Sequence, residues 1–393
     1  MDIGREKACL CALNRIFGFE PKIGTALISH LGCAAEVFEL ERKDLDTILG
    51  PYSRFRNEIT ETNVGKAAEE LEKLEAKGIR FTGWSEDGYP ELLKDCEDAP
   101  VGLYIRSTTP DYLLWNRRKS VSIVGTRDIS PYGREWCTRI VRRFADTSEK
   151  PVIISGLAIG TDICAHRTAI DAGLPTIAVM ATGPDAVYPV RHTDFAERMA
   201  STPGCALVTD YPPGTAPLAV HFLRRNRIIA GLSEATILIE SKIKGGGMMT
   251  AGLAFSYGRE VYAVPGRIDD ICSQGCNNLV RKKMAEPVTD MSALLESLGM
   301  SAGKSRERMS GKEKIESLYG STLPRDKVDM MTRILLHIKK YRGTTVEELS
   351  CACGLSYSLV SQMTSLLEAD GLITVDLLQR CSINANNQIN LSE

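Results

Sequence analysis

Arginines beside an apolar run are the first residues of this sequence whose chemistry stands out. The segment Phe222–Ser233 reads FLRRNRIIAGLS and contains Arg224, Arg225 and Arg227. The spacing of its apolar residues predicts a helix over residues 225–232, which places the arginines at the positively charged end of the helix dipole. That arrangement is unfavourable alone and becomes favourable when an anion binds, so the segment indicates a phosphate site. The alternative is that these arginines pair with carboxylates elsewhere in the protein.

Small-residue loops after several expected strands supply other groups that a phosphate needs. Gly125, Thr126 and Arg127 follow the strand expected over residues 121–124. Glycine lets the backbone approach a ligand, a hydroxyl donates a hydrogen bond, and a guanidinium clamps two phosphate oxygens. Similar loops follow later strands, at residues 155–162, 181–183, 212–215 and 242–247. Because the carboxyl ends of parallel strands meet at one edge of a sheet, these loops should converge with the arginine run into one anion site.

The sequence lacks the motifs of two common nucleotide-binding classes. It has no Gly-x-x-x-x-Gly-Lys-Ser/Thr segment, which disfavours a P-loop nucleotidase. After the first strand it reads Gly125-Thr-Arg-Asp, with arginine where a dinucleotide-binding loop needs glycine. We therefore expect no nicotinamide or flavin, and no other cofactor.

Catalytic residues are also poorly represented. Asp162 and His166 are four residues apart on an expected helix and share a face, so they form either an acid–base pair or an orienting hydrogen bond near the helix start. The 12 cysteines include no Cys-x-x-Cys pair, and none is spaced with histidines as a zinc site requires. We expect a binding protein without catalytic or metal-ligating residues. The alternative is a nucleotide-processing enzyme of the phosphoribohydrolase type, using Asp162 or Glu240 on a nucleoside monophosphate.

The overall charge restricts how this chain contacts nucleic acid. Its 393 residues carry a formal net charge of -2 and are 43% hydrophobic. A protein that coats nucleic acid through its total positive charge is thereby excluded, so any contact must be local. The start lacks a signal-type apolar segment and no later stretch is apolar enough to span a bilayer, so we expect a cytoplasmic protein without a membrane partner.

Alternating strands and helices must position the anion site. The strands are expected at residues 121–124, 152–154, 176–179, 206–208, 236–239 and 261–264. The helices are expected at residues 132–145, 161–172, 194–200, 225–232 and 249–257. This alternation predicts an α/β fold, a doubly wound, Rossmann-like sheet with helices on both faces.

Composition shifts divide the chain into four parts. Residues 1–77 predict a helical domain, in which the turn at residues 17–24 is similar to a helix-hairpin-helix or SAM-type unit. Residues 78–298 predict the Rossmann-like domain that carries the anion site, residues 299–323 a linker, and residues 324–393 a winged-helix domain. The expected recognition helix, 356–370, has no lysine or arginine, which disfavours a transcription regulator that docks in the major groove.

Residues 120–285 resemble the DNA-processing protein A family, also called DprA or Smf. The resemblance rests on Ile123–Arg127, Ser155–Asp162, Tyr188-Pro189, Phe222–Ser233, Met249–Ala251, Gly258–Gly266 and Gly275–Asn277. It implies a single-stranded-DNA-binding protein of natural transformation, or competence, and DNA recombination. Such a protein protects incoming DNA, helps load the RecA recombinase and forms a homodimer.

The resemblance also implies roles for individual residues. Gly125, Thr126 and Arg127 would hold a phosphate, Phe222 would contact a base, and Asn226 with Arg227 would shape the pocket. Leu223 stands where the family usually has proline, and a lysine often found just before the phenylalanine is missing. The complete predicted DNA-binding set is Gly125, Thr126, Arg127, Ser155, Gly156, Leu157, Phe222, Arg224, Arg225, Asn226, Arg227, Lys242, Gly246 and Gly247.

Overall fold

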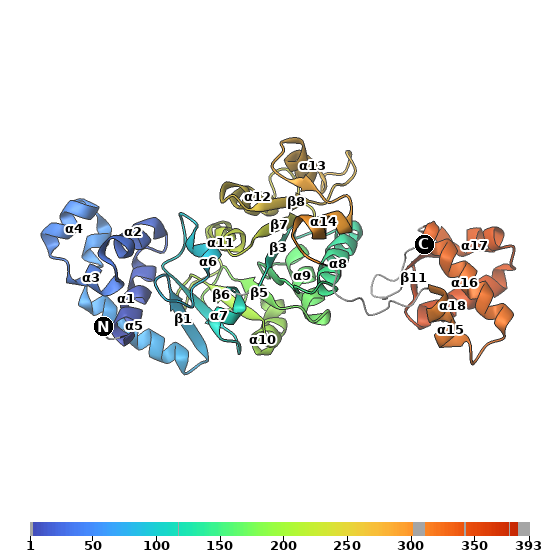
Figure 1. Cartoon of the computed structure of the whole chain (residues 1–393), viewed down its shortest axis with the longest axis horizontal. Helices are drawn as coiled ribbons and strands as arrows, with labels where there is room; N and C mark the ends of the chain where they lie inside the picture. The colour runs from blue at the N-terminus through green and yellow to red at the C-terminus, as the bar shows by residue number, and fades with distance from the viewer. Residues whose placement is uncertain (1–2, 117, 302–310, 342, 377, 384–393) are drawn as a thin grey trace. The chain divides into compact units, whose positions relative to one another are not determined.

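The protein is described by a computed structural model, which covers residues 3–116, 118–301, 311–341, 343–376 and 378–383. The chain divides into two compact units, Met1–Gly303 and Lys304–Glu393. Figure 1 shows the first as helices α1 to α5 followed by a sheet with helices on both sides, and the second as a small group of helices.

One sheet of nine strands organises the described part of the first unit. Its strand order is β1-β2-β6-β5-β4-β3-β7-β8-β9. In this order across the sheet, all the strands from β6 through β3 to β9 run parallel to one another. Strand β2 is antiparallel to both of its neighbours, β1 and β6. The strands are β1 Ile79–Gly83, β2 Gly102–Arg106, β3 Ser120–Val124, β4 Val152–Ser155, β5 Thr176–Val179, β6 Ala206–Thr209, β7 Ala235–Leu238, β8 Glu260–Ala263 and β9 Glu286–Pro287.

Helices cover both faces of this sheet because its central strands are apolar on both sides. One face is covered by α11 Ala219–Gly231, α12 Gly246–Ser256 and α13 Gln274–Arg281, together with the short α6 Glu91–Lys94. The other face is covered by α8 Pro131–Ala145, α9 Thr161–Asp171, α10 Thr193–Ser201 and α14 Met291–Ser297. Two short elements, α7 Asp111–Leu114 and η2 Val190–His192, lie in connections. The predicted doubly wound, mostly parallel sheet is confirmed.

The order of the strands reverses between β3 and β7. From β3 the chain adds β4, β5 and β6 in one direction, then returns to place β7 on the other side of β3. The helix after β3, α8, lies on one face of the sheet, and the helix after β7, α12, lies on the other. The loops leaving the two strands therefore separate and leave a crevice at their carboxyl ends, where ligands of such sheets bind.

The N-terminal helices pack against the antiparallel end of the sheet. They are α1 Ile3–Ile16, α2 Pro21–Leu31, α3 Ala34–Glu39, α4 Arg42–Leu49, the 3-10 turn η1 Arg54–Asn57 and α5 Glu61–Glu75. Their hydrophobic core includes Phe81 and Tyr104 from β1 and β2, whose rings meet edge to face at 5.1 Å. The chain entering the sheet is thus anchored by shared apolar burial.

The second unit has its own hydrophobic core. Its elements are α15 Gly311–Tyr319, α16 Arg325–Lys340, β10 Thr344–Thr345, α17 Val346–Cys353, α18 Tyr357–Ala369, β11 Ile373–Val375 and β12 Arg380–Ile383. Its three described strands have the order β10-β12-β11. Ile315 and Tyr319 of α15 are buried in this core, so the later half of the segment predicted as a linker packs with the C-terminal helices. Its classification as a winged helix stays a prediction.

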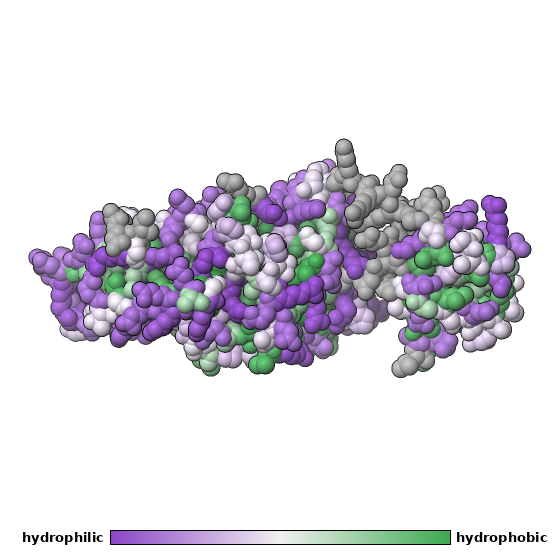
Figure 2. Space-filling view, turned by 90° about the horizontal axis from the view of Figure 1, so that it is seen from below, coloured by the Kyte–Doolittle hydropathy of each residue, from purple (hydrophilic) through white to green (hydrophobic). Residues whose placement is uncertain are grey.

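Hydrophilic residues cover most of the face that Figure 2 shows, with separate small hydrophobic areas between them. Among the described residues, no helix combines the length and the apolar character that crossing a membrane requires.

Candidate nucleic-acid interface

A pocket of about 480 Å³ lies at the crevice between β3 and β7. Four segments form most of it: the loop after β3, the loop after β4 with the start of α9, the loop after β7 with the start of α12, and one side of α11. Nine of the predicted site residues line it, namely Gly125, Thr126, Arg127, Phe222, Arg225, Asn226, Lys242, Gly246 and Gly247. The predicted loops after β3, β4 and β7 do meet here, at the reversal of strand order, whereas the predicted loops at residues 181–183 and 212–215 do not line this pocket.

Arg127 is the exposed cation of this pocket that is best placed for a ligand. Its guanidinium carbon lies 5.3 Å from the ring centroid of Phe222, a cation–π contact. Tyr188, which is 45% exposed, meets the same ring edge-on at 5.4 Å. Within the described ranges, no ion pair involves Arg127. A charged group and two aromatic rings thus stand together beside the pocket, whose lining also includes the carboxylates of Asp128 and Asp162.

The start of α12 contributes backbone donors to the same pocket. Gly246 and Gly247 are its first residues, so their N–H groups have no acceptor within the helix and lie at its positive end. A Cβ at Gly247 would approach the Leu238 side chain to 2.7 Å and the Gly125 backbone to 3.1 Å. Only glycine therefore lets the two loops pack this closely. Exposed Lys242 and Lys244 precede the helix and add positive charge.

The loop after β3 is held in place by the start of α9. The backbone N–H and the hydroxyl of Thr161 both donate to the carbonyl oxygen of Thr126, at 3.1 and 3.2 Å. Gly160 makes this contact possible, since its φ is +84° and a Cβ there would lie 2.3 Å from that oxygen. The Thr126 hydroxyl oxygen accepts from the Asp128 N–H at 3.1 Å. Its hydrogen remains available to donate to a phosphate.

The arginine run does not stand at a helix entrance, which corrects the sequence prediction. Helix α11 begins at Ala219, so Arg224, Arg225 and Arg227 lie in its second and third turns. Its first residue was missed because the N-cap, Leu218, makes no side-chain capping bond and gives no signal in the sequence. The positive helix end at the pocket belongs to α12 instead.

Each arginine of the run bonds to another part of the protein. Buried Arg225 donates to the carbonyl oxygens of Gly156, at 2.7 Å, and Val179. Burial lowers the pKa of Arg225 to about 10, so it stays charged at neutral pH. The other two arginines lie outside the pocket lining. Arg227 forms a buried ion pair with Asp210, and Arg224 donates to the Gly18 carbonyl oxygen at 2.9 Å. The alternative, that these arginines bond to other parts of the protein, therefore holds for Arg224 and Arg227 and in part for Arg225.

Five predicted site residues do not line the pocket: Ser155, Gly156, Leu157, Arg224 and Arg227. The first three are the last residue of β4 and the two that follow it. The Ser155 hydroxyl donates to the Ile123 carbonyl oxygen at 2.6 Å, and the Leu157 carbonyl oxygen contacts the His192 ring nitrogen at 2.9 Å. All three residues are buried.

The structure adds pocket residues that sequence reasoning missed. They include Asp128, Ile159, Leu223, Lys244, Thr250 and Cys272. Lys244 precedes the glycines of the β7 loop, so its position was readable from the sequence. Leu223, 47% exposed, follows Phe222 on α11, but its exposure depends on where the helix begins.

The residues considered for catalysis make structural hydrogen bonds, and one of them, Asp162, also lines the pocket. His166 is fully buried and its Nδ1 lies 2.7 Å from the hydroxyl oxygen of Thr176. That hydroxyl donates to the Ile153 carbonyl oxygen, so Nδ1 carries the hydrogen of the bond. Asp162 accepts from the Ala158 N–H at 3.3 Å, so the considered acid–base pair gives way to separate structural bonds. Glu240 is buried and accepts from the N–H and hydroxyl of Ser130, the N-cap of α8.

We expect the stability of the protein to fall as the pH drops below about 6.5, because His166 is held neutral in the folded state. Burial, with a smaller effect of the Arg225 charge, lowers its pKa to about 3, and no described group bonds its Nε2. Between these pKa values the unfolded chain binds more protons, so acid favours unfolding. Urea midpoints at about pH 7.5 and about pH 5 should differ less for His166→Gln than for the wild type. Equal differences in both proteins would contradict this role of His166.

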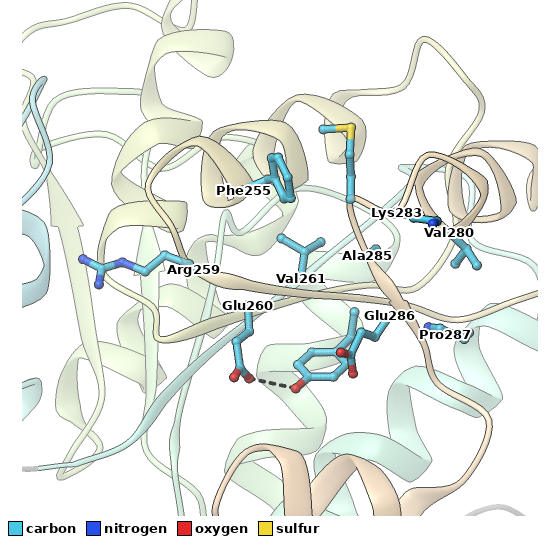
Figure 3. Close-up of a pocket in the computed structure, with 11 residues that line it drawn as sticks. Phe255, Arg259, Glu260, Val261, Val280, Lys283, Ala285, Glu286 and Pro287 are labelled. Carbon is cyan, nitrogen blue, oxygen red and sulfur yellow. Dashed lines mark hydrogen bonds between the residues drawn. The ribbon is translucent and has the colours of Figure 1, made fainter.

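A second pocket, of about 500 Å³, lies at the β8–β9 edge of the sheet (Figure 3). Phe255, Val261 and Val280 provide apolar walls, and the carboxylates of Glu260 and Glu286 are also at its lining. Glu260 accepts a hydrogen bond from the Tyr262 hydroxyl at 2.7 Å. Arg259 and Lys283 also line this pocket, and none of the predicted site residues does.

Comparison with known proteins gives consistent results. The profile of the family described as DNA recombination-mediator protein A matches residues 80–299. Protein Smf of Synechocystis sp. is 30% identical over 328 residues, which are 81% of this chain and 80% of that protein. The DNA processing protein DprA of Bacillus subtilis is 36% identical over 206 residues, or 52% of this chain and 67% of that protein.

A solved structure extends the comparison to the fold. The X-ray structure of DNA processing protein A from Streptococcus pneumoniae matches with a TM-score of 0.60 and 29% identity, over 75% of this chain and 95% of that one. The matched residues 80–299 contain the sheet from β2 to β9 and all the segments that form the pocket between β3 and β7. This chain therefore belongs to the DNA recombination-mediator protein A family, the DprA/Smf family of DNA-processing proteins.

Proposed function

We propose that the protein binds single-stranded DNA in the pocket between β3 and β7. The observation that carries this proposal is the exposed Arg127 guanidinium on the Phe222 ring, beside the N-terminal amides of α12. The guanidinium and the amides bind phosphate oxygens, and the aromatic rings stack on a base. A polynucleotide uses both the phosphate-binding groups and the aromatic rings. A free anion uses only the phosphate-binding groups.

The geometry favours single strands over duplex. Base stacking on an aromatic side chain needs an unstacked base, and in a duplex the bases already stack on each other. The pocket lies among loops at the carboxyl ends of the central strands β3 and β7. Since every base has a π face, binding is expected to tolerate any sequence.

Replacing Arg127 by alanine should weaken binding to oligonucleotides of unrelated sequence to a similar degree, because a phosphate contact carries no sequence information. The plot of log affinity against log salt should lose about 0.7 of slope for the one phosphate contact removed. Fluorescence anisotropy over a range of salt concentrations measures both quantities.

Arg198→Ala is the matched control for this measurement. Arg198 is an exposed arginine on α10, which covers the other face of the sheet, and its ion pair with Asp171 is solvent-exposed. Its loss should change neither affinity nor slope. Unchanged affinity and slope in a folded Arg127→Ala protein would contradict the proposal.

The biological role follows from the family. We propose that the protein acts in the cytoplasm as a homodimer during natural transformation, protects incoming single strands and helps load the RecA recombinase onto them. Membership of a family described as recombination mediators supports this role. Nuclease protection of a bound strand and RecA-dependent strand exchange, with the wild type and Arg127→Ala compared, test it. Strand exchange that responds equally to both proteins would oppose a role that depends on this pocket.

A further inference from the structure

An aromatic residue of the N-terminal helices is left exposed beside α11. Phe19 lies in the turn between α1 and α2 and is 50% exposed. Phe17, two residues earlier, is fully buried and packs on Phe55 at 4.9 Å. Phe17 therefore serves the hydrophobic core, and the exposure of Phe19 leaves part of a large apolar ring in water, which is unfavourable unless a ligand covers it.

Arg224 of α11 fixes the position of the Phe19 ring. Its guanidinium carbon lies 4.5 Å from the ring centroid, and its Nη2 donates to the carbonyl oxygen of Gly18. The ring also neighbours His221, whose centroid is 6.0 Å away. Because one side of the ring is occupied by a cation that is itself tied to the backbone, the remaining surface is a rigid platform with positive charge behind it.

The same arrangement occurs twice across α11. At the pocket, the Arg127 guanidinium lies on the Phe222 ring, and at the N-terminal turn the Arg224 guanidinium lies on the Phe19 ring. Phe222 and Arg224 are two residues apart, so they lie on different sides of the helix. Leu223 between them is 47% exposed and lines the pocket. The exposed side chain of Leu223 thus forms an apolar crest, which lies on α11 between the two arginine–phenylalanine pairs.

A strand that leaves the pocket over this crest can reach the second pair. Crossing one helix covers about 10 Å, which is about three nucleotides at the ~3.4 Å axial rise of a stacked strand and fewer for an extended strand. The occupant suggested by this geometry is a further base of the same strand, because stacking uses the ring and the nearby guanidinium attracts the backbone. A protein partner would use the ring as an apolar contact and would not need an aromatic residue at this position.

We propose that Phe19, backed by Arg224, is a second base-stacking subsite for the strand held in the pocket. This inference rests on the proposed binding of single-stranded DNA. It extends the interface from the Rossmann-like sheet to the N-terminal helices and makes affinity depend on the length of the strand.

The test is a series of thymidine oligonucleotides from about 2 nucleotides, too short to reach from the pocket to Phe19, to about 16 nucleotides, with binding measured by anisotropy. Phe19→Ala should leave the affinity for the shortest strands unchanged and reduce the affinity for the longest by roughly 5- to 150-fold. Phe19→Leu should behave like Phe19→Ala, because leucine keeps an apolar contact and removes the π face. Phe19→Trp should bind long strands at least as well as the wild type.

Tyr112→Ala is the matched control, since Tyr112 is 48% exposed and lies on α7, which is outside the pocket lining. It should not change affinity at any length. A second readout is the fluorescence of the indole that Phe19→Trp introduces, corrected for the wild-type signal, which long strands should quench and short strands should not. This readout holds even where Phe19→Ala is destabilised.

The outcomes separate the two proposals. In one outcome, Phe19→Ala and Phe19→Leu bind long strands as tightly as the wild type while Arg127→Ala binds them more weakly. That result would overturn the subsite and leave the pocket function in place. An equal loss at every length would overturn it as well, because Phe19 would then act through the fold. If wild-type protein binds no strand of the series, both proposals fail.

Discussion

Replacing Arg127 and Phe222 together by alanine should lower the affinity for single-stranded DNA roughly 100- to 1000-fold, the largest functional effect that the pocket predicts. The first change removes a charge-assisted bond to phosphate and the second removes a stacking surface. The two side chains touch, with the guanidinium carbon 5.3 Å from the ring, so their effects should not simply add.

A double-mutant cycle measures this coupling. Each single variant should lose part of the affinity, and the double variant should lose less than the sum of the two free-energy changes, because either change already disturbs the stack. Thermal unfolding should be little altered, since Arg127 is exposed and Phe222 is only partly buried. A double variant that binds DNA like the wild type would refute the assignment of the pocket as the binding site.

Replacing Arg227 by alanine should have the opposite profile, a large loss of stability. Arg227 and Asp210 form an ion pair whose side chains are 6% and 5% exposed. Removing the arginine leaves the Asp210 carboxylate buried and without its counter-charge, which costs about 3–5 kcal/mol in comparable proteins. Urea unfolding followed by circular dichroism should show a lower midpoint for Arg227→Ala.

Two further variants sharpen this prediction. Removing both charges in Arg227→Met with Asp210→Leu should recover most of the lost stability. Within the described residues, Nε of Arg227 and Oδ1 of Asp210 already lack hydrogen-bond partners, so the pair is only partly satisfied. Arg106→Ala is the matched control because Glu197, its partner at 2.6 Å, is 53% exposed. If Arg227→Ala loses no more stability than Arg106→Ala, the Asp210 carboxylate becomes solvated in the variant and the prediction is wrong.

The three arginines Arg127, Arg225 and Arg227 therefore divide into two groups. Arg127 faces the pocket from a loop, and its loss should affect ligand binding. Arg225 and Arg227 are buried in α11, and their loss should affect the packing of the loops and strands that they join. Arg225 connects α11 to the carbonyl oxygens of Gly156 and Val179, which follow or end the neighbouring strands β4 and β5.

The strands and most helices around the sheet were predictable because their signal is local. Short β-branched runs such as Val152–Ser155 are apolar on both faces, as strands buried on both sides must be. The starts of α11 and α12 were not predictable, because their N-caps, Leu218 and Gly245, make no side-chain capping bond. Strand β1 was missed because it joins the sheet through antiparallel pairing with β2, which follows only after a helix and several turns and so leaves no local pattern.

By itself, the sequence determined that glycine-rich loops would meet at the carboxyl ends of a parallel sheet, since alternating strands and helices permit few arrangements. The tertiary structure alone decided which arginine is available to a ligand. Arg227 is paired with Asp210, 17 positions earlier, and bonded to the carbonyl oxygen of Asp98, 129 positions earlier. Whether a guanidinium is paired depends on groups that only folding brings close to it. The spacing of residues along the chain does not show which groups these are.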